Sequence, residues 1–264
     1  MLRKLYFVFL LNMAVKGAVG KSLNEDTSSS SEIIGGKDVD IKQYPHQIAI
    51  LDDDLRFFCS GSILSENYVL TAAHCPETSN GIIHTKIRAG SSFHAEGGKI
   101  YNVLSVIFHP KRVKLTYDYD VAVLKTEKIA IDGVTTKPVK LADAGSSLEP
   151  GELVDVTGWG ATANETSSNV LQLVSLPVID FQQCQQYWNN FPVTITARML
   201  CAGYDIPVKS ACHGDSGGPL HAESSSVQYG IVSFGSPQCD TPKIPNVYTY
   251  IPAVRGWIQE VTGI

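Results

Sequence analysis

Short apolar runs alternate with turn-forming residues along most of the chain. Many of these runs are rich in β-branched and aromatic side chains, which favour strands. From residue 33 to about residue 140 they predict strands over 47–51, 61–72, 82–89, 100–109 and 120–124. A second series after Pro138 predicts strands over 153–158, 171–178, 199–203, 227–234 and 246–250. This spacing is typical of an all-β barrel or sandwich.

Two segments follow the helical period instead. A short helix is expected over Asp180–Trp188, and a longer one over Pro252–Val261. Proline suits the first turn of the second helix, where its missing N–H would have no partner in any case. Apolar residues recur in that helix at i, i+3, i+4 and i+7, so one face should pack against the protein body. They are Val254, Trp257, Ile258 and Val261.

The N-terminus has the pattern of a secretory signal peptide. Arg3 and Lys4 precede an apolar run, and the small residues at 18–20 predict cleavage after Gly20. A membrane anchor is the alternative, but the run is shorter than the ~20 residues that span a bilayer. We therefore expect residues 1–20 to direct a soluble, extracellular product. The polar, serine-rich residues 21–32 are expected to be a removable activation propeptide.

Composition narrows the class of protein. The length of 264 residues allows one large domain or two small ones, and an apolar content of 44% fits a globular core. The net charge is −5 and no basic run follows the first few residues, so nucleic acid is not expected as a partner. None of the six cysteines has C-x-x-C spacing, which argues against zinc. In a secreted chain they predict three disulfides, with fifteen pairings open.

Three stretches carry the candidate chemistry. Ser216 lies among glycines at residues 212–220, where backbone N–H groups could hold an oxyanion; an ordinary surface turn is the alternative. His74 could be a catalytic base or a core histidine. Asp120 opens an apolar run. If its carboxylate is buried there it needs a partner; the alternative is that Asp120 lies at a strand end in water and needs none.

Together these stretches resemble the trypsin/chymotrypsin family of serine endopeptidases. The matching motifs occur in the family's order over about residues 33–264. They are IIGG at 33–36, TAAHC at 71–75, DVAVL at 120–124, GWG at 158–160, GDSGGP at 214–219 and VSFG at 232–235. The resemblance implies two packed six-stranded antiparallel β-barrels, divided near residue 138, with a C-terminal helix. It also implies the disulfides Cys59–Cys75, Cys184–Cys201 and Cys212–Cys239.

The resemblance assigns a role to each candidate residue. It implies that Ser216 is the nucleophile, His74 the general base and acid, and Asp120 the group that holds the imidazole. The backbone N–H groups of Gly214 and Ser216 would form the oxyanion hole. Ser233 would lie on the strand that pairs with the substrate backbone. The implied reaction is peptide-bond hydrolysis through an acyl-enzyme, with no metal or cofactor required.

The resemblance also implies a zymogen. Cleavage of the Glu32–Ile33 bond would create an α-ammonium group, and Asp215 would pair with it to order the active site. Glu32 departs from the basic residue that is common before this bond, so a trypsin-like activator is not implied. The expected partners are protein substrates, protein protease inhibitors and an activating protease, and the chain is expected to be a monomer.

The residues expected at the substrate pocket favour substrates with a non-basic side chain before the cleaved bond. Ser210 lies where a trypsin-like enzyme would carry aspartate, and Gly235 leaves the pocket entrance open. Asn246 stands where glycine is usual. Its amide is expected to enter the pocket and shorten it; alternatively it faces away and binds a loop carbonyl. Cleavage after apolar or other non-basic residues, as in chymotrypsin, is therefore expected.

The family's calcium loop should be absent, because Ser91 stands where calcium-binding members have an acid. Asn164 begins an N-glycosylation motif.

A catalytically silent homologue that acts as a binding module is the alternative function, although all three triad residues are present. A narrow cascade enzyme would carry an added N-terminal domain, for which 21–32 is too short, so digestion or broad processing is favoured.

Overall fold

The computed structural model describes most of the chain beyond its N-terminal segment. The described residues are 35–77, 81, 86–162, 167–205, 209–223, 225–239 and 241–264, and all belong to one unit spanning residues 31–264. The predicted signal peptide, the propeptide, Ile33 and the glycosylation motif at Asn164 lie outside the described residues.

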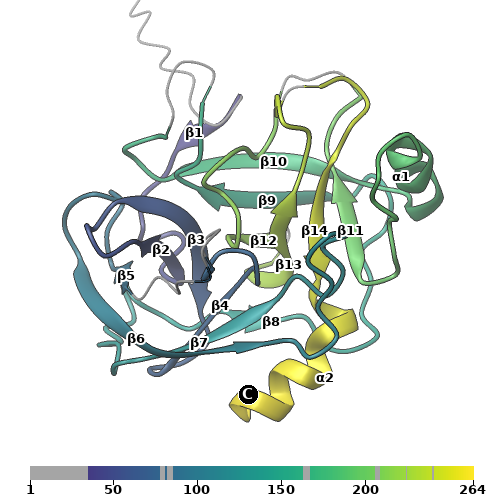
Figure 1. Ribbon diagram of the computed structural model, residues 1–264. Helices are drawn as coiled ribbons and strands as arrows, with labels where there is room; N and C mark the ends of the chain where they lie inside the picture. The colour runs from purple at the N-terminus through teal and green to yellow at the C-terminus, as the bar shows by residue number, and fades with distance from the viewer. Residues whose placement is uncertain are drawn as a thin grey trace, which may run out of the picture. The chain divides into compact units, whose positions relative to one another are not determined.

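Six antiparallel strands close into a first barrel in the order β2-β3-β4-β7-β6-β5 (Figure 1). Closure pairs every strand on both sides and so leaves no exposed sheet edge. The strands are β2 (Gln47–Leu51), β3 (Phe57–Ile63), β4 (Tyr68–Thr71), β5 (Lys86–Ala89), β6 (Lys99–Phe108) and β7 (Ala122–Thr126).

Six further strands form a second closed ring, β9-β10-β11-β14-β13-β12, in which β9 also pairs with β10. They are β9 (Leu153–Gly158), β10 (Gln172–Ile179), β11 (Met199–Ala202), β12 (Pro219–Ala222), β13 (Val227–Phe234) and β14 (Asn246–Tyr250). Two short strands, β1 (Lys37–Asp38) and β8 (Lys140–Leu141), add to β10 and β13. The expected pair of six-stranded antiparallel barrels is confirmed.

Two helices follow the second-barrel strands, α1 (Phe181–Trp188) and α2 (Ile251–Thr262). The Asp180 carboxylate caps α1 by accepting the N–H groups of the first turn. Helix α2 ends at Gly263, whose φ of 75° is the left-handed conformation that glycine tolerates. Both predicted helices are therefore confirmed. In the described part of the chain, neither is long and apolar enough to cross a membrane.

Some strand limits differ from the sequence expectation. The run predicted over 61–72 is two strands, because the chain reverses at 64–67 and the Leu64 N–H bonds to the Tyr68 carbonyl at 2.8 Å. Asp120 lies just before β7 rather than inside a strand. Strand β12 was not predicted, and it begins with Pro219, a position where a strand can lack an N–H.

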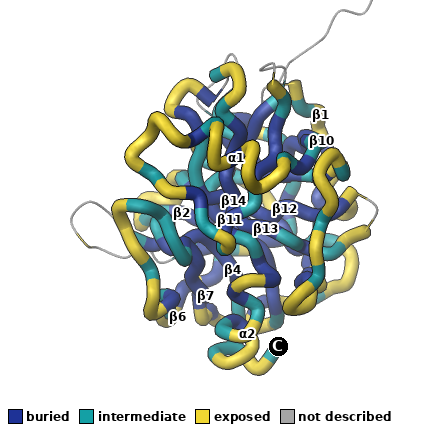
Figure 2. Tube along the Cα trace, turned by 90° about the vertical axis from the view of Figure 1, so that its right-hand side faces the viewer, coloured by how far each residue is buried: buried dark blue, intermediate teal, exposed yellow. Residues whose placement is uncertain are grey.

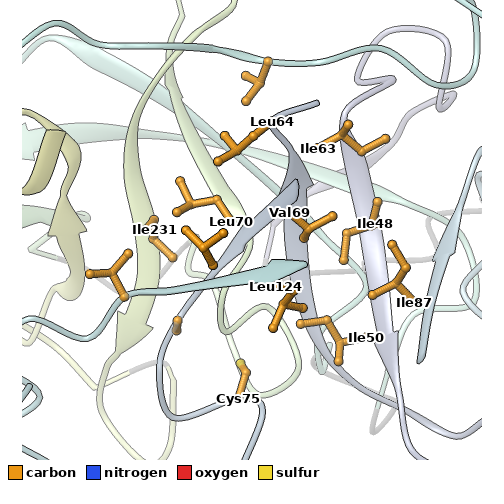
Figure 3. Packing of buried hydrophobic residues seen from close by; sticks show 14 of the residues in the cluster. Ile48, Ile50, Ile63, Leu64, Val69, Leu70, Cys75, Ile87, Leu124 and Ile231 are labelled. Atoms are coloured by element: carbon orange, nitrogen blue, oxygen red, sulfur yellow. The ribbon is translucent and has the colours of Figure 1, made fainter. Parts of the chain in front are cut away.

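The apolar faces of these elements form a continuous core around the first barrel. Ile48, Ile50 and Ile87 are completely buried within it (Figure 3). Ile231 from β13 and Ile258 from α2 belong to the same cluster, so the core also holds the second barrel and the C-terminal helix in place. Figure 2 shows the pattern along the chain: buried strands inside and exposed loops outside.

Backbone hydrogen bonds and three disulfides fix the segments that carry the candidate residues. The Ser60 N–H on β3 bonds to the Ser216 carbonyl at 2.8 Å, and the Thr249 hydroxyl on β14 bonds to the Asp120 carbonyl at 2.8 Å. Ser216 and Asp120 are thus each tied to the opposite barrel. The three disulfides have the implied pairing, Cys59–Cys75, Cys184–Cys201 and Cys212–Cys239, with Cα–Cα distances of 6.0, 6.2 and 5.3 Å.

Candidate active site

His74 and Asp120 form a doubly hydrogen-bonded pair. The His74 ring nitrogen Nδ1 lies 2.7 Å from Asp120 Oδ2, and the His74 backbone N–H donates to Oδ1 at 2.9 Å. The Asp120 side chain is almost wholly buried, whereas 27% of the His74 side chain is exposed. Because Nδ1 is held by the carboxylate, Nε2 is the nitrogen that remains to exchange a proton.

A third side chain completes the surroundings of Asp120. The Ser233 hydroxyl donates to Asp120 Oδ2 at 2.6 Å. Burial alone would raise the pKa of Asp120, but the charge of His74 and the hydrogen bonds from His74 and Ser233 bring that pKa below its ordinary value. Asp120 therefore stays ionised at neutral pH. This contact was not predicted, because the two residues lie 113 positions apart along the chain.

His74 and Ser216 line one cavity of about 270 Å³, with walls from both barrels. In the described structure no hydrogen bond joins the Ser216 hydroxyl to the imidazole. The turn around Ser216 depends on glycine, since Gly214 and Gly217 have φ values of 98° and 80°. The sequence-predicted nucleophile and base thus share a cavity, with Asp120 behind the base.

Two backbone N–H groups beside Ser216 are without acceptors among the described residues. They belong to Gly214 and to Ser216 itself, whereas the intervening Asp215 N–H bonds to the Cys212 carbonyl at 3.0 Å. A Cβ on Gly214 would lie 3.1 Å from both Gly160 and the Phe57 ring, so only glycine fits this turn easily. Two unengaged donors next to a hydroxyl can hold a negatively charged oxygen.

Asp215 is completely buried and has no cationic partner among the described residues. Its carboxylate accepts the backbone N–H groups of Gly160 at 2.8 Å and Cys212 at 2.9 Å. Burial raises the pKa of Asp215 to about 6, although these two hydrogen bonds act in the opposite direction. The residue that would supply its expected partner, Ile33, lies outside the described part.

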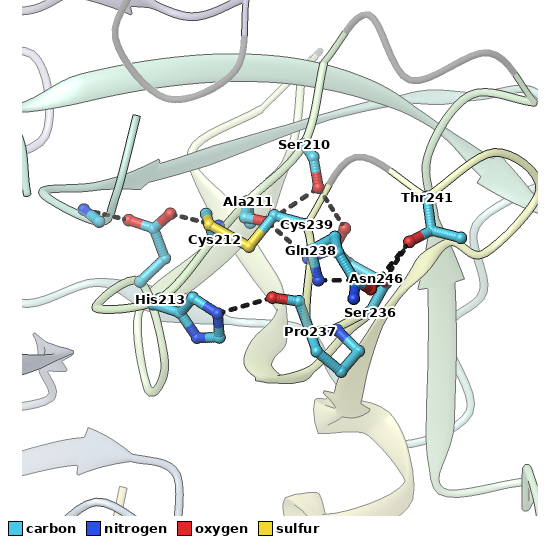
Figure 4. The surroundings of a disulfide bond; sticks show 12 residues. Ser210, Ala211, Cys212, His213, Ser236, Pro237, Gln238, Cys239, Thr241 and Asn246 are labelled. Atoms are coloured by element: carbon cyan, nitrogen blue, oxygen red, sulfur yellow. Dashed lines mark hydrogen bonds between the residues drawn. A yellow bond between two sulfur atoms is a disulfide. The ribbon is translucent and has the colours of Figure 1, made fainter. Parts of the chain in front are cut away.

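Asn246 lines the cavity, and Ser210 is hydrogen bonded to it (Figure 4). The Ser210 hydroxyl lies 2.8 Å from Asn246 Oδ1, and Asn246 Nδ2 donates to the Ala211 carbonyl at 2.9 Å. Asn246 therefore lines the cavity and also binds a loop carbonyl, which combines the two orientations considered from sequence. A Cβ on Gly235 would lie 3.0 Å from Asn246 Nδ2, so glycine there leaves the space beside the amide open.

Tyr117 is one of the cavity residues that the sequence interpretation missed. It lines the cavity from the first barrel, with its ring centre 5.7 Å from that of His74 in an edge-on arrangement and 5.3 Å from that of Phe234. The available signal was the repeat Tyr-Asp-Tyr-Asp at 117–120, in which only the last residue matched a motif. Tyr117 thus packs against the imidazole of His74.

The described residues offer few ligands for a metal near this site. Two clusters bring a histidine close to two cysteines, Cys59/His74/Cys75 and Cys212/His213/Cys239, but all four sulfur atoms belong to disulfides. In the loop where the family's calcium was considered, the Arg88 guanidinium donates to the carbonyls of Ala95 and Gly97. A fixed cation that uses these carbonyl oxygens disfavours a calcium ion there.

Comparison with known proteins places the chain among close relatives. A family model described as Trypsin matches residues 33–258. Trypsin 5G1 of Aedes aegypti is 38% identical, over 89% of this chain and 87% of its own length. Trypsin of Phaedon cochleariae is 37% identical over 97% of this chain and 99% of its own. A solved structure of a scabies mite inactivated protease paralogue, S-D1, matches with a TM-score of 0.78 and 28% identity, covering 88% of this chain and 97% of the other.

The buried Asp215 carboxyl gives a pH prediction for the unprocessed chain. A carboxyl whose pKa is about 6 when folded and 3.8 when unfolded releases its proton first in the unfolded state. As the pH rises from about 4 to about 6, the free energy of unfolding should therefore fall. The contribution of this group to the fall is up to about 3 kcal/mol. Urea denaturation over this pH range, compared with Asp215→Asn, isolates the effect.

The comparison with Asp215→Asn is needed because two buried histidines, His46 and His221, have lowered pKa values and act in the opposite direction. Their contribution is common to both proteins and cancels in the difference. Inactive Ser216→Ala is the parent of both, so that proteolysis does not disturb the measurement. A difference between the two proteins that does not change with pH would contradict the prediction.

Proposed function

The chain belongs to the trypsin family of serine proteases, and we propose that it is a secreted endopeptidase, made as a zymogen, that cleaves after non-basic residues. One observation carries the catalytic part of this proposal: Ser216 and His74 share a cavity, with Asp120 holding the far side of the imidazole. Broad processing or digestion is the proposed role, and 1–20 is the proposed signal peptide.

The proposed reaction begins at the Ser216 hydroxyl. Its oxygen attacks the carbonyl carbon of the substrate while His74 Nε2 accepts its proton. Asp120 keeps Nδ1 protonated and stabilises the imidazolium that forms. His74 then gives the proton to the leaving amine, which departs and leaves an acyl group on Ser216. Water, activated by the same imidazole, hydrolyses that ester and restores the enzyme.

The backbone N–H groups of Gly214 and Ser216 are proposed to hold the oxygen that becomes negatively charged in each tetrahedral intermediate. Their lack of other acceptors supports this role, because preorganised donors need not be released during the reaction. A donor of this kind contributes about 3–4 kcal/mol to transition-state stability by precedent. The Ser233 hydroxyl supports the same reaction from behind, by helping to keep Asp120 ionised.

Specificity for non-basic side chains is proposed from the wall of the cavity. Asn246 lines that wall with a neutral amide, and the hydroxyl of Ser210, also neutral, is hydrogen bonded to this amide. A lysine or arginine side chain entering this wall would lose water without gaining a counter-charge. Two relatives are named trypsin, which concerns their own activity; the proposal for this chain rests on Ser210.

A catalytically silent binding protein remains the alternative function, and one neighbour, the scabies mite paralogue, is described as inactivated. The present chain retains Ser216, His74 and Asp120, with the last two hydrogen bonded at 2.7 Å. Retention of all three favours an active enzyme. The triad experiment below separates the two possibilities directly.

Removal of triad side chains is the first test. In the activated enzyme, Ser216→Ala and His74→Ala should each lower kcat roughly 10⁶-fold, and Asp120→Asn roughly 10⁴-fold, as in other serine proteases. Hydrolysis of a chromogenic peptide and labelling by a serine-directed inhibitor measure the effect. Ser147→Ala, an exposed serine, is the matched control and should keep full activity. Activity in Ser216→Ala equal to that of the parent would contradict the mechanism.

Substrate preference is tested with peptides that differ only in the residue on the acyl side of the cleaved bond. We expect higher kcat/KM for Leu, Met, Phe, Tyr or Gln than for Arg or Lys. Ser210→Asp should raise kcat/KM for Lys and Arg peptides, relative to kcat/KM for the apolar peptides, by more than about 10-fold, because the carboxylate supplies a counter-charge. Asn246→Gly should instead favour larger aromatic residues, because it lengthens the pocket. A strong preference of the parent enzyme for Arg or Lys would refute the specificity.

Activation is tested on the protein isolated from its natural source. Mass spectrometry of the active form should find Ile33 as its first residue. Asp215→Asn should still be cut after Glu32 but should gain little activity, because the buried ion pair that orders the site is lost, at a cost of about 3–5 kcal/mol. An active form that begins at another residue would remove the zymogen proposal.

A further inference from the structure

Two buried histidines, His46 and His221, lie side by side in a cavity separate from that of His74 and Ser216. His46 precedes β2 and His221 lies on β12, and their exposed fractions are 5% and 3%. Their ring centres are 4.6 Å apart. Both rings line a cavity of about 190 Å³ that shares no residue with the catalytic cavity. Neither histidine has a role in the proposed reaction.

Nitrogen atoms of both rings lack partners. His46 Nε2 and both ring nitrogens of His221 are buried without a hydrogen bond in the described structure. The backbone of Asp155 acts to raise the pKa of His221, although neither ring nitrogen of His221 meets the geometry of a hydrogen bond. Burial is the dominant effect and lowers the pKa of His221 to about 4. An imidazole binds a metal ion through a ring nitrogen that has no other partner, and each of the two rings offers one.

The rest of the cavity wall is acidic. Asp155 and Glu223 line it, together with Tyr44, and among the described residues no lysine or arginine does. Asp155 is already engaged by the Ser175 hydroxyl at 2.6 Å. The two histidines and two acids do not bring three ligand atoms within 4.8 Å of one another as they lie, so the exposed Glu223 side chain has to turn toward the rings to serve as a ligand. Two neutral imidazoles beside carboxylates are a donor set that suits a divalent transition metal.

The ring separation fits a shared ion. With metal–nitrogen bonds of about 2.0–2.1 Å, two imidazoles on one tetrahedral ion have centres roughly 5 Å apart. We propose that His46 and His221, with Glu223 as third ligand, bind one Zn²⁺ ion that links the first barrel to β12 of the second. Binding to the folded state alone then stabilises the docked barrels by mass action.

Direct binding tests the site without reference to activity. Zn²⁺ is titrated calorimetrically into the full chain carrying Ser216→Ala and no affinity tag, and Co²⁺ serves as the spectroscopic probe. We expect one Zn²⁺ per chain, a tetrahedral Co²⁺ spectrum and a higher unfolding temperature with Zn²⁺. His221→Gln should lower the affinity at least about 100-fold and abolish the thermal shift.

Matched variants separate this site from others on the chain. His74→Ala removes the catalytic imidazole and His94→Gln removes a histidine outside both cavities; both variants should bind Zn²⁺ like the parent. Glu223→Ala changes an exposed side chain, so it should fold normally, as checked by near-ultraviolet circular dichroism, and should weaken binding at least about 10-fold.

Absence of Zn²⁺ binding, or unchanged affinity in His221→Gln, overturns the proposal. Loss of binding in His74→Ala overturns it as well, because the ion would then lie at the catalytic site. If His221→Gln does not fold, Glu223→Ala decides, and unchanged affinity there overturns the site. All of these readouts use an inactive parent, so they are independent of whether the proposed protease function holds.

Discussion

A carboxylate buried between two barrels must receive its hydrogen bonds from both of them. Asp120 meets this constraint with the backbone and ring of His74 from the first barrel and the hydroxyl of Ser233 from the second. Its own carbonyl is bound by Thr249 on β14. Leaving such a charge unpaired would cost several kcal/mol, so the barrels are stable together only when this network closes. The same hydrogen bonds to Asp120 therefore hold the two barrels together and orient the imidazole of His74.

The serine turn obeys a related constraint, close approach of backbone to backbone. Gly217 has a φ of 80°, and a side chain there would collide with Thr71 and with the Ser60 carbonyl. The Ser216 carbonyl is held by the Ser60 N–H at 2.8 Å. The turn is therefore seated against β3 and β4 of the opposite barrel, near the segment that carries His74. The glycines of the motif are needed for this contact as much as for the N–H groups that the turn presents.

Local pattern predicted the elements well where strands are isolated and poorly where the chain turns within an apolar run. Strands β2, β9, β13 and β14 have the predicted limits, while 61–72 merged two strands across a four-residue turn. The disulfide pairing came from the family resemblance, since spacing left it open. The contact of Ser233 with Asp120 and that of Tyr117 with His74 could not be predicted. Both arise only when segments distant in sequence are packed together.

Buried polar groups in this fold fall into two kinds, and the difference has consequences. Asp120 is satisfied entirely by the chain as it folds. Asp215 and the rings of His46 and His221 are not: the first has two N–H donors but no cation among the described residues, and nitrogens of the other two have no partner. A neutral state lessens the cost of burying each group, as their shifted pKa values indicate. A buried group of this second kind is stabilised most when a partner binds to it after folding. For Asp215 this partner is the proposed new N-terminus, and for the two histidines it is the proposed ion.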